Sequence, residues 1–166
     1  NRYRGFESLP FRHYYREGQM EELVEKMKVV LGSTFVAGLK AHGYHWNVIG
    51  SDFPQLHDFF AEIYGEYEGS IDDIAEQIRQ LDSFSHGTVA RMLELSTINE
   101  DEKIPTAEKM IANLLTCNEA ILSVTTEAYN MAEEQKAFGL SNYLQDRITA
   151  LTKLNWKIKA TLGKKS

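Results

Sequence analysis

Four side chains between residues 42 and 76 are of types that bind borderline or hard metal ions. His45 and His57 offer imidazole nitrogens, and Asp72 and Glu76 offer carboxylate oxygens. Imidazole together with carboxylate suits ions such as Fe(II), with zinc as a substitute. The residue types therefore predict an iron site, provided that the fold brings these side chains together.

The spacing of these residues limits how they can meet. Asp72 and Glu76 are four residues apart, so on a helix they share one face and can chelate one ion. His57 precedes Asp72 on the same predicted helix by a length of about 22 Å, at about 1.5 Å per residue. One chain therefore cannot place both on the same ion. Two copies of this helix, antiparallel about a two-fold axis, would form two identical sites, each with His45 and His57 from one chain and Asp72 and Glu76 from the other.

Each of these residues also has a plainer interpretation when taken alone. A histidine on an apolar helix stripe is commonly a hydrogen-bonded core or interface residue, and this alternative is strongest for His57. Asp72 and Glu76 alone fit a solvated helix face, and Trp46 alone fits interface packing. The joint pattern favours metal binding over these alternatives.

Composition indicates a single soluble globular domain. The chain has 166 residues, of which 43% are hydrophobic and 25% charged. The single cysteine, Cys117, fits a reducing compartment. No stretch resembles a signal peptide or approaches a membrane span. We expect a cytoplasmic protein without a membrane partner.

Charge is unevenly distributed along the chain. Residues 1–18 carry a net charge of +2 and residues 153–166 carry +5, so residues 19–152 carry −13 within the total of −6. An acidic body attracts cations, and basic ends can contact phosphate.

Hydrophobic periodicity predicts four long helices. The first begins near Met20 and ends near Val48, with Gly50 as its stop. The second runs from about Phe53 to Leu81 after an Asp52 N-cap. A short helix follows Thr88, a third long helix begins at Thr106, and a fourth begins at a Ser141 cap and ends at Gly163. We therefore divide the chain into an N-terminal arm (residues 1–18), a helical domain (19–163) and a short basic tail (164–166).

The order of these elements predicts an all-α, ferritin-like four-helix bundle. The long link between the second and third helices can cross the bundle and contains the short helix, as this arrangement requires. Di-iron sites inside such bundles use a Glu-x-x-His pair, and no histidine of this chain is preceded by that pattern. A site within one bundle is therefore not expected.

Residues 20–162 resemble the Dps family of ferritin-like mini-ferritins. The resemblance rests on HWNVIG at 45–50, Phe53, His57, DDIAE at 72–76, YLQDR at 143–147 and NW at 155–156. It implies a hollow dodecamer that oxidises Fe(II) at the dimer interface, often with hydrogen peroxide, and stores ferric mineral inside. It also implies that His45, His57, Asp72 and Glu76 are iron ligands and that Trp46 lies beside the site, so that all five belong to the ferroxidase site.

One position departs from the family pattern. The family usually has an aspartate four residues after the second histidine, where this chain has Ala61. Asp58 and Glu62 point about 100–140° away from His57 on a helix, so neither is a clean substitute. His42, one turn before His45, is a further candidate. We expect one well-held metal ion and a weak second position near His57.

DNA binding is the weaker function that the resemblance implies. Lys164 and Lys165 form a short basic tail, and Arg2, Arg4 and Arg12 offer a second basic segment. The acidic body opposes DNA, and lysines at a helix end also complement the helix dipole. Two functions remain: a ferroxidase and iron-storage cage, or a non-catalytic cage or DNA-compacting protein whose metal site is impaired by Ala61.

Overall fold

The computed structural model describes the backbone of residues 9–164 and the side chains of residues 18–164. Five helices account for its regular structure: α1 (Leu9–Asn47), α2 (Phe53–Gln80), α3 (Val89–Leu95), α4 (Ala107–Glu134) and α5 (Phe138–Thr161). No strand occurs between residues 9 and 164. The predicted all-α class is confirmed.

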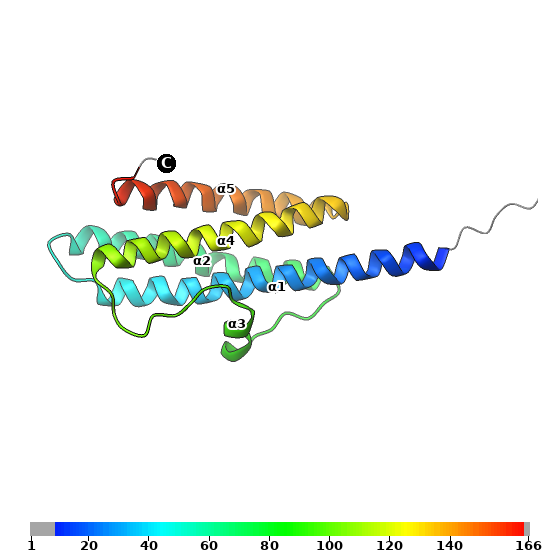
Figure 1. Cartoon of the computed structure of the whole chain (residues 1–166), viewed down its shortest axis with the longest axis horizontal. Coiled ribbons are helices and arrows are strands. Elements are labelled where there is room, and N and C mark those ends of the chain that lie inside the picture. Colours follow the sequence, from blue (N-terminus) through cyan, green and yellow to red (C-terminus); the bar gives the residue numbers. More distant parts are fainter. Residues whose placement is uncertain (1–8, 165–166) are drawn as a thin grey trace, which may run out of the picture.

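The four long helices form a bundle with one long crossover. Figure 1 shows α1 and α2 running antiparallel, joined by a short turn at one end of the bundle. The crossover, residues 81–106, returns along the bundle and carries α3, so that α4 runs in the same direction as α2. α1 packs against α2, α4 and α3, and α4 packs against α5. The ferritin-like arrangement predicted from the helix order is confirmed.

The apolar stripes of the long helices form a core of two hydrophobic clusters along the bundle. Tyr67, Phe60 and Leu31 are among its largest fully buried side chains. One side of α2 buries six apolar side chains, which are Leu56, Phe60, Ile63, Tyr67, Ile74 and Ile78. Burial of such side chains contributes about 1.5–3 kcal/mol each relative to exposure, so α2 is held firmly with its opposite face toward solvent.

Local signals fix most helix ends. Gly50 has φ +128°, a left-handed conformation that favours glycine, and it separates α1 from α2. Pro54 lies in the first turn of α2, where its missing N–H costs nothing. The hydroxyls of Thr88 and Thr106 accept hydrogen bonds from the backbone of α3 and α4, as predicted. Asp52 occupies the N-cap position of α2, but its side chain makes no capping hydrogen bond.

Two predicted helix starts differ from the structure. α1 begins at Leu9 rather than near Met20, so part of the segment predicted as an arm is helical backbone; Figure 1 shows this end of α1 extending past the other helices. Residues 1–8 lie outside the described residues. α5 begins at Phe138, and Ser141 lies inside it, where its hydroxyl donates to the Phe138 carbonyl. The break between α4 and α5 therefore lies at residues 135–137, before the Ser141 cap that the sequence predicts.

The crossover approaches α1 closely. A Cβ at Gly32 would lie 2.8 Å from Cβ of Leu95 and 2.8 Å from the carbonyl oxygen of Met92, so only glycine fits. The neighbouring Ser33 hydroxyl accepts a 3.0 Å hydrogen bond from the Thr97 backbone N–H. These contacts position residues 97–106 beside the C-terminal half of α1. None of the helices in residues 9–164 has the length and apolar character needed to cross a membrane.

Candidate metal site

His45 and His57 meet at the end of the bundle where α1 passes into α2. Their rings stack with centroids 3.7 Å apart and planes inclined by 23°. Nδ1 of His45 is 2.7 Å from the backbone oxygen of His57, and Nδ1 of His57 is 2.9 Å from the backbone oxygen of His45. The short turn at Gly50 therefore pairs two histidines that are twelve residues apart.

These two hydrogen bonds determine which ring nitrogens remain available. A carbonyl oxygen only accepts, so Nδ1–H of each ring must be the donor. In the neutral rings the lone pairs then lie on the two Nε2 atoms. A backbone carbonyl on the far nitrogen is the arrangement that orients metal-binding histidines and raises the basicity of the ligand atom. Nε2 of His45 and Nε2 of His57 are therefore the ring atoms that remain for a ligand.

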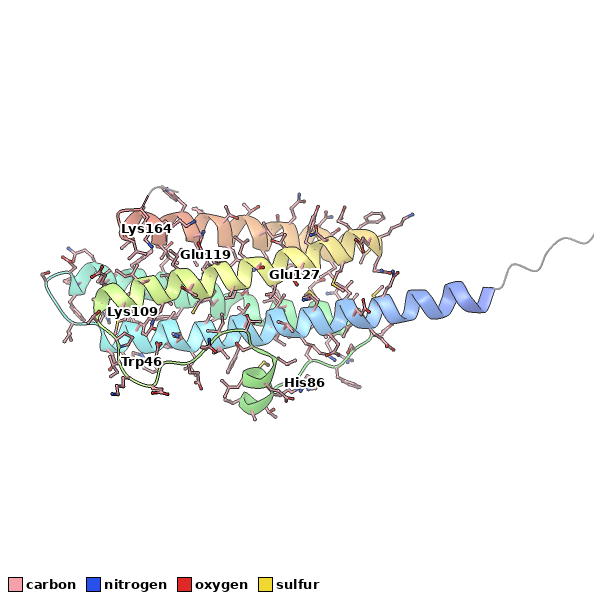
Figure 2. The ribbon with its side chains drawn as sticks, viewed as in Figure 1. Trp46, His86, Lys109, Glu119, Glu127 and Lys164 are labelled. Atoms are coloured by element: carbon pink, nitrogen blue, oxygen red, sulfur yellow. The ribbon has the colours of Figure 1, made fainter. Side chains whose placement is uncertain are left out.

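Aromatic side chains surround the histidine pair. Phe53 lies 5.0 Å from the His57 ring, and Tyr64 presents its edge to His45 at 5.3 Å. Trp46 lies 4.4 Å from His42 and is 61% exposed. Figure 2 shows Trp46 near the end of the bundle where α1 ends. An exposed tryptophan beside half-buried imidazoles is available to another molecule rather than to the core of this chain.

Asp72 and Glu76 lie on the exposed face of α2, more than three turns from His57. The structure therefore brings His45 and His57 together, but not with Asp72 and Glu76 of the same chain. Among residues 18–164, no group of three or more His, Cys, Asp or Glu side chains is close enough to hold a metal ion. Within the described chain, the imidazoles and the carboxylates form two separate half-sites.

Position 61 is a partly buried alanine one turn after His57. Of its possible substitutes, Glu62 forms an ion pair with Lys157 of α5 and so turns away from the histidines. Asp58 is exposed, on the solvent side of α2. Nδ1 of His42 lies 3.2 Å from a carboxylate oxygen of Glu68, which is the one histidine–carboxylate contact in the described chain.

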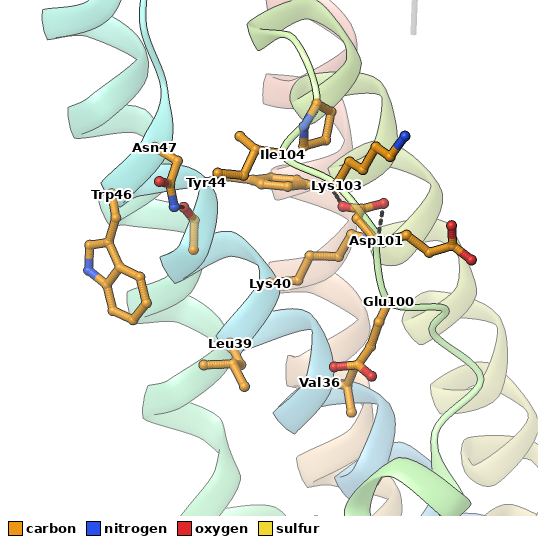
Figure 3. Close-up of a pocket in the computed structure, with 13 residues that line it drawn as sticks. Val36, Leu39, Lys40, Tyr44, Trp46, Asn47, Glu100, Asp101, Lys103 and Ile104 are labelled. Atoms are coloured by element: carbon orange, nitrogen blue, oxygen red, sulfur yellow. Dashed lines mark hydrogen bonds and ion pairs between the residues drawn. The ribbon is translucent and has the colours of Figure 1, made fainter.

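A second polar cluster was not predicted from the sequence. Tyr44 donates a hydrogen bond to Asp101, and Asn113 donates to the Tyr44 hydroxyl at 2.9 Å and to Asp101 at 3.2 Å. Lys40 completes the cluster at 3.1 Å from Asp101. Burial and the Asp101 hydrogen bond raise the pKa of Tyr44 well above its usual value. Figure 3 shows Lys40 and Tyr44 directed toward Asp101, while Trp46 points away from it.

Lys40, Tyr44 and Asp101 line a pocket of about 330 Å³ between α1 and residues 100–105. The sequence signal was weak, because the partners come from three segments and Asp101 belongs to a charged run that resembles an ordinary loop. We call Lys40, Tyr44, Asp101 and Asn113 the Tyr44 cluster.

Residues 24–166 match the ferritin-like domain family. The chain is 30% identical over 143 residues to general stress protein 20U of Bacillus subtilis, covering 86% of this chain and 99% of that protein. It is 30% identical over 140 residues to the DNA protection during starvation protein of Helicobacter pylori, covering 84% of this chain and 97% of that protein.

The fold also matches that of a Dps protein from Vibrio cholerae O1, described as a member of a broad superfamily of ferritin-like diiron-carboxylate proteins. The TM-score is 0.83 at 27% identity, and the match covers 87% of this chain and 91% of that chain. The helix order, the family match and these relatives agree with the resemblance found at residues 20–162. The chain belongs to the Dps family of ferritin-like proteins.

Proposed function

We propose that this protein oxidises Fe(II) at sites shared between two subunits and stores the ferric product inside a cage, which protects the cell from oxidative damage. The observation that carries the proposal is the reciprocal hydrogen bonding of His45 and His57, which leaves both Nε2 atoms free to bind metal. Family membership supports the iron chemistry, since the Vibrio cholerae relative is described as a ferritin-like diiron-carboxylate protein.

The shared site follows from the two half-sites. About 22 Å of helix separates His57 from Asp72 at about 1.5 Å per residue. Two α2 helices packed antiparallel about a two-fold axis bring the histidines of one chain to Asp72 and Glu76 of the other. One iron position then has His45, Asp72 and Glu76 as ligands, with room left for an oxidant.

The middle of α2 supports close packing of two copies. Gly65 and Gly69 lie inside this helix, where glycine costs about 1 kcal/mol relative to alanine. A Cβ at either position would meet nothing within 4 Å in the chain, and both positions are exposed. Gly65 is also close to the midpoint between His57 and the Asp72–Glu76 pair, where the proposed two-fold axis would cross α2. Approach of a second α2 explains glycine at positions that the single chain leaves unexplained.

The chemistry requires two electrons for each hydrogen peroxide. Two Fe(II), one H2O2 and two protons yield two Fe(III) and two H2O. The first Fe(II) has one imidazole and two carboxylates as ligands. Beside His57, the absence of a carboxylate at Ala61 leaves a second dication without charge compensation. We therefore propose that hydrogen peroxide oxidises Fe(II) more slowly at this site than it would if position 61 were an aspartate.

Iron oxidation by the purified protein tests this function. Anaerobic protein is mixed with Fe(II) and then with peroxide, and ferric products are followed by ultraviolet absorbance. His45→Ala and Asp72→Ala should each reduce the initial rate to that of free Fe(II). Glu127→Ala is the control, because Glu127 forms an ion pair with Lys26 on another part of the bundle. Oxidation at the unaltered rate in both site variants would favour the alternative, a non-catalytic cage.

Assembly is tested separately from oxidation. We propose a homo-oligomer, a dodecamer built from two-fold dimers. Gly65→Leu should block the dimer contact while the helices remain folded, as measured by light scattering and circular dichroism. Gly139→Leu is the matched control, because a Cβ at Gly139 also meets nothing within 4 Å and lies on α5. A stable wild-type monomer, or an unchanged oligomer with Gly65→Leu, would contradict the α2 interface.

For DNA we propose only weak, salt-sensitive binding. Lys164 is exposed at the end of the chain, whereas Arg2, Arg4, Lys165 and the side chain of Arg12 lie outside the described residues. Each phosphate contact steepens the log–log salt dependence by about 0.7–0.9. Tight binding at physiological salt that survives deletion of residues 163–166 and of residues 1–18 would contradict this proposal.

A further inference from the structure

His42 and Glu68 form a side-chain pair beside the histidine site. Nδ1 of His42 lies 3.2 Å from Oε1 of Glu68, and the two side chains are 29% and 46% exposed. The His42 ring is fixed by Tyr64, which stacks on it at 4.0 Å with planes inclined by 16°. Trp46 contacts the same ring at 4.4 Å. The imidazole is therefore held in place while its carboxylate partner remains accessible to solvent.

The separation of the two donor atoms suits a metal ion. Nitrogen and oxygen ligands lie about 2.0–2.2 Å from Zn(II), so two adjacent ligands in a tetrahedral shell are about 3.3 Å apart. The 3.2 Å between Nδ1 of His42 and Oε1 of Glu68 matches this value. The separation of the two donor atoms is therefore the one that a bound cation would require.

The pair lies close to the position where the second Fe(II) of the proposed reaction lacks a carboxylate ligand. His42 is one turn before His45, and their ring centroids are 6.0 Å apart. Glu68 lies on α2 of the same chain and contacts His42, so the pair needs no residue from a partner subunit. An aspartate at position 61 would supply a carboxylate beside the His57 imidazole. His42 and Glu68 supply the same combination of donor types one helical turn away.

We propose that His42 and Glu68 bind a second divalent cation, which during iron oxidation is the second Fe(II) of each site. The role of this cation in iron oxidation rests on the proposed function, whereas the geometry of the His42–Glu68 pair does not. The pair supplies one neutral ligand and one negative charge, and water completes the coordination shell. The Fe(II) at this pair gives the second of the two electrons that peroxide accepts. It is then released as Fe(III).

Cobalt binding tests the pair without any oxidation. Apo-protein in its assembled form is titrated with Co(II) by calorimetry and by its visible absorption. Wild type should bind about two ions per chain, as a two-metal site requires, and His42→Ala or Glu68→Gln about one. His86→Ala and Glu127→Gln are the matched controls, since His86 is also partly buried and Glu127 is also a half-exposed partner in an ion pair.

A second variant separates this inference from the proposed function. Asp72→Ala should remove the first ion and leave the ion at His42 and Glu68, so binding again falls to about one per chain. Anomalous scattering from Co(II)-soaked crystals of the wild-type protein should show a peak between His42 and Glu68. If His42→Ala and Glu68→Gln bind as many ions as wild type, or if that peak is missing, the pair is only a hydrogen bond and the inference is wrong. Binding of about two ions per chain by Asp72→Ala, while His42→Ala and Glu68→Gln bind about one, would overturn the proposed function instead.

Discussion

Tyr44 and His45 are neighbours in α1, yet they belong to two polar clusters of opposite character. The Tyr44 hydroxyl donates to Asp101 and accepts from Asn113, and the carboxylate is also bound by Lys40. Among residues 18–164, His45 makes its side-chain hydrogen bond through Nδ1, and Nε2 has no partner there. One cluster is satisfied by its own chain, and the other leaves available the Nε2 atoms that we propose as metal ligands.

The difference separates a structural role from a chemical one. A buried polar group that finds all its partners stabilises a fold, because leaving it unpaired costs about 1–3 kcal/mol. The Tyr44 cluster attaches residues 99–101 to α1 in this way, with the Lys40 ammonium also donating to the Asn99 carbonyl at 2.7 Å. The half-buried imidazoles lie next to an exposed tryptophan, and we propose that a metal ion and a second chain complete their contacts.

The largest expected effect is the loss of metal binding in His45→Ala. Removal of a residue that only supports a ligand lowers metal affinity about 10–100-fold, so loss of the ligand itself should exceed that range. Stability should fall little, since His45 contributes one hydrogen bond to the His57 carbonyl. Calorimetric titration with Co(II) and a thermal melt measure both quantities. Unchanged affinity for the first ion would show that His45 is a structural residue like Tyr44.

Asp101→Ala should lower stability and leave metal binding unchanged. It leaves the Tyr44 hydroxyl and the Lys40 ammonium without their shared carboxylate, at a cost of about 2–3 kcal/mol in unfolding free energy. The number of Co(II) ions bound per chain should stay the same. Glu102→Ala is the control, because Glu102 is an exposed neighbour in the same loop. A drop in metal stoichiometry with Asp101→Ala would mean that the two clusters are not independent.

The contrast also explains what the sequence could predict. Apolar periodicity located the helices and six buried positions of α2, because packing against one side leaves a single stripe. α1 contacts α2, α3 and α4, so burial extends around it and includes Tyr44, which a single apolar stripe does not identify. His45 and His57 were identified by residue type and motif. Their reciprocal hydrogen bonds were not, because these depend on the geometry of the turn at Gly50.

Ala61→Asp should give a smaller, positive effect. An aspartate one turn after His57 adds a charged ligand beside it, and should tighten the second metal ion at least about tenfold and speed oxidation by peroxide. It should also restore oxidation to Glu68→Gln, since either carboxylate can hold the second Fe(II). Asp72→Ala should abolish metal binding at the first position, that of His45, whether residue 61 is alanine or aspartate. Stopped-flow oxidation of these variants measures the effect, and two fully occupied ions at His45 and His57 in the unaltered protein would contradict the argument.

The smallest expected effect is a loss of stability at alkaline pH through Cys117, which borders the Tyr44 cluster. Burial raises the pKa of this thiol from 9.0 to about 11. The neutral thiol is therefore favoured by folding, and its contribution is complete below pH 9 and lost as the pH rises through about 11. Urea unfolding between these pH values should show a steeper decline for wild type than for Cys117→Ala. Parallel declines would indicate a solvent-accessible thiol.

A mixing experiment tests the shared site most directly. His45→Ala and Asp72→Ala subunits, each inactive alone, are unfolded together in equal amounts and reassembled. In a mixed dimer one interface site carries both substitutions and the other carries neither, because each site takes its histidines from one chain and its carboxylates from the other. Random pairing makes half the dimers mixed, so the account predicts recovery of about one quarter of the wild-type sites. Reassembled protein of the correct size, with no more Fe(II) oxidation than either parent, would contradict a site shared across the two-fold axis.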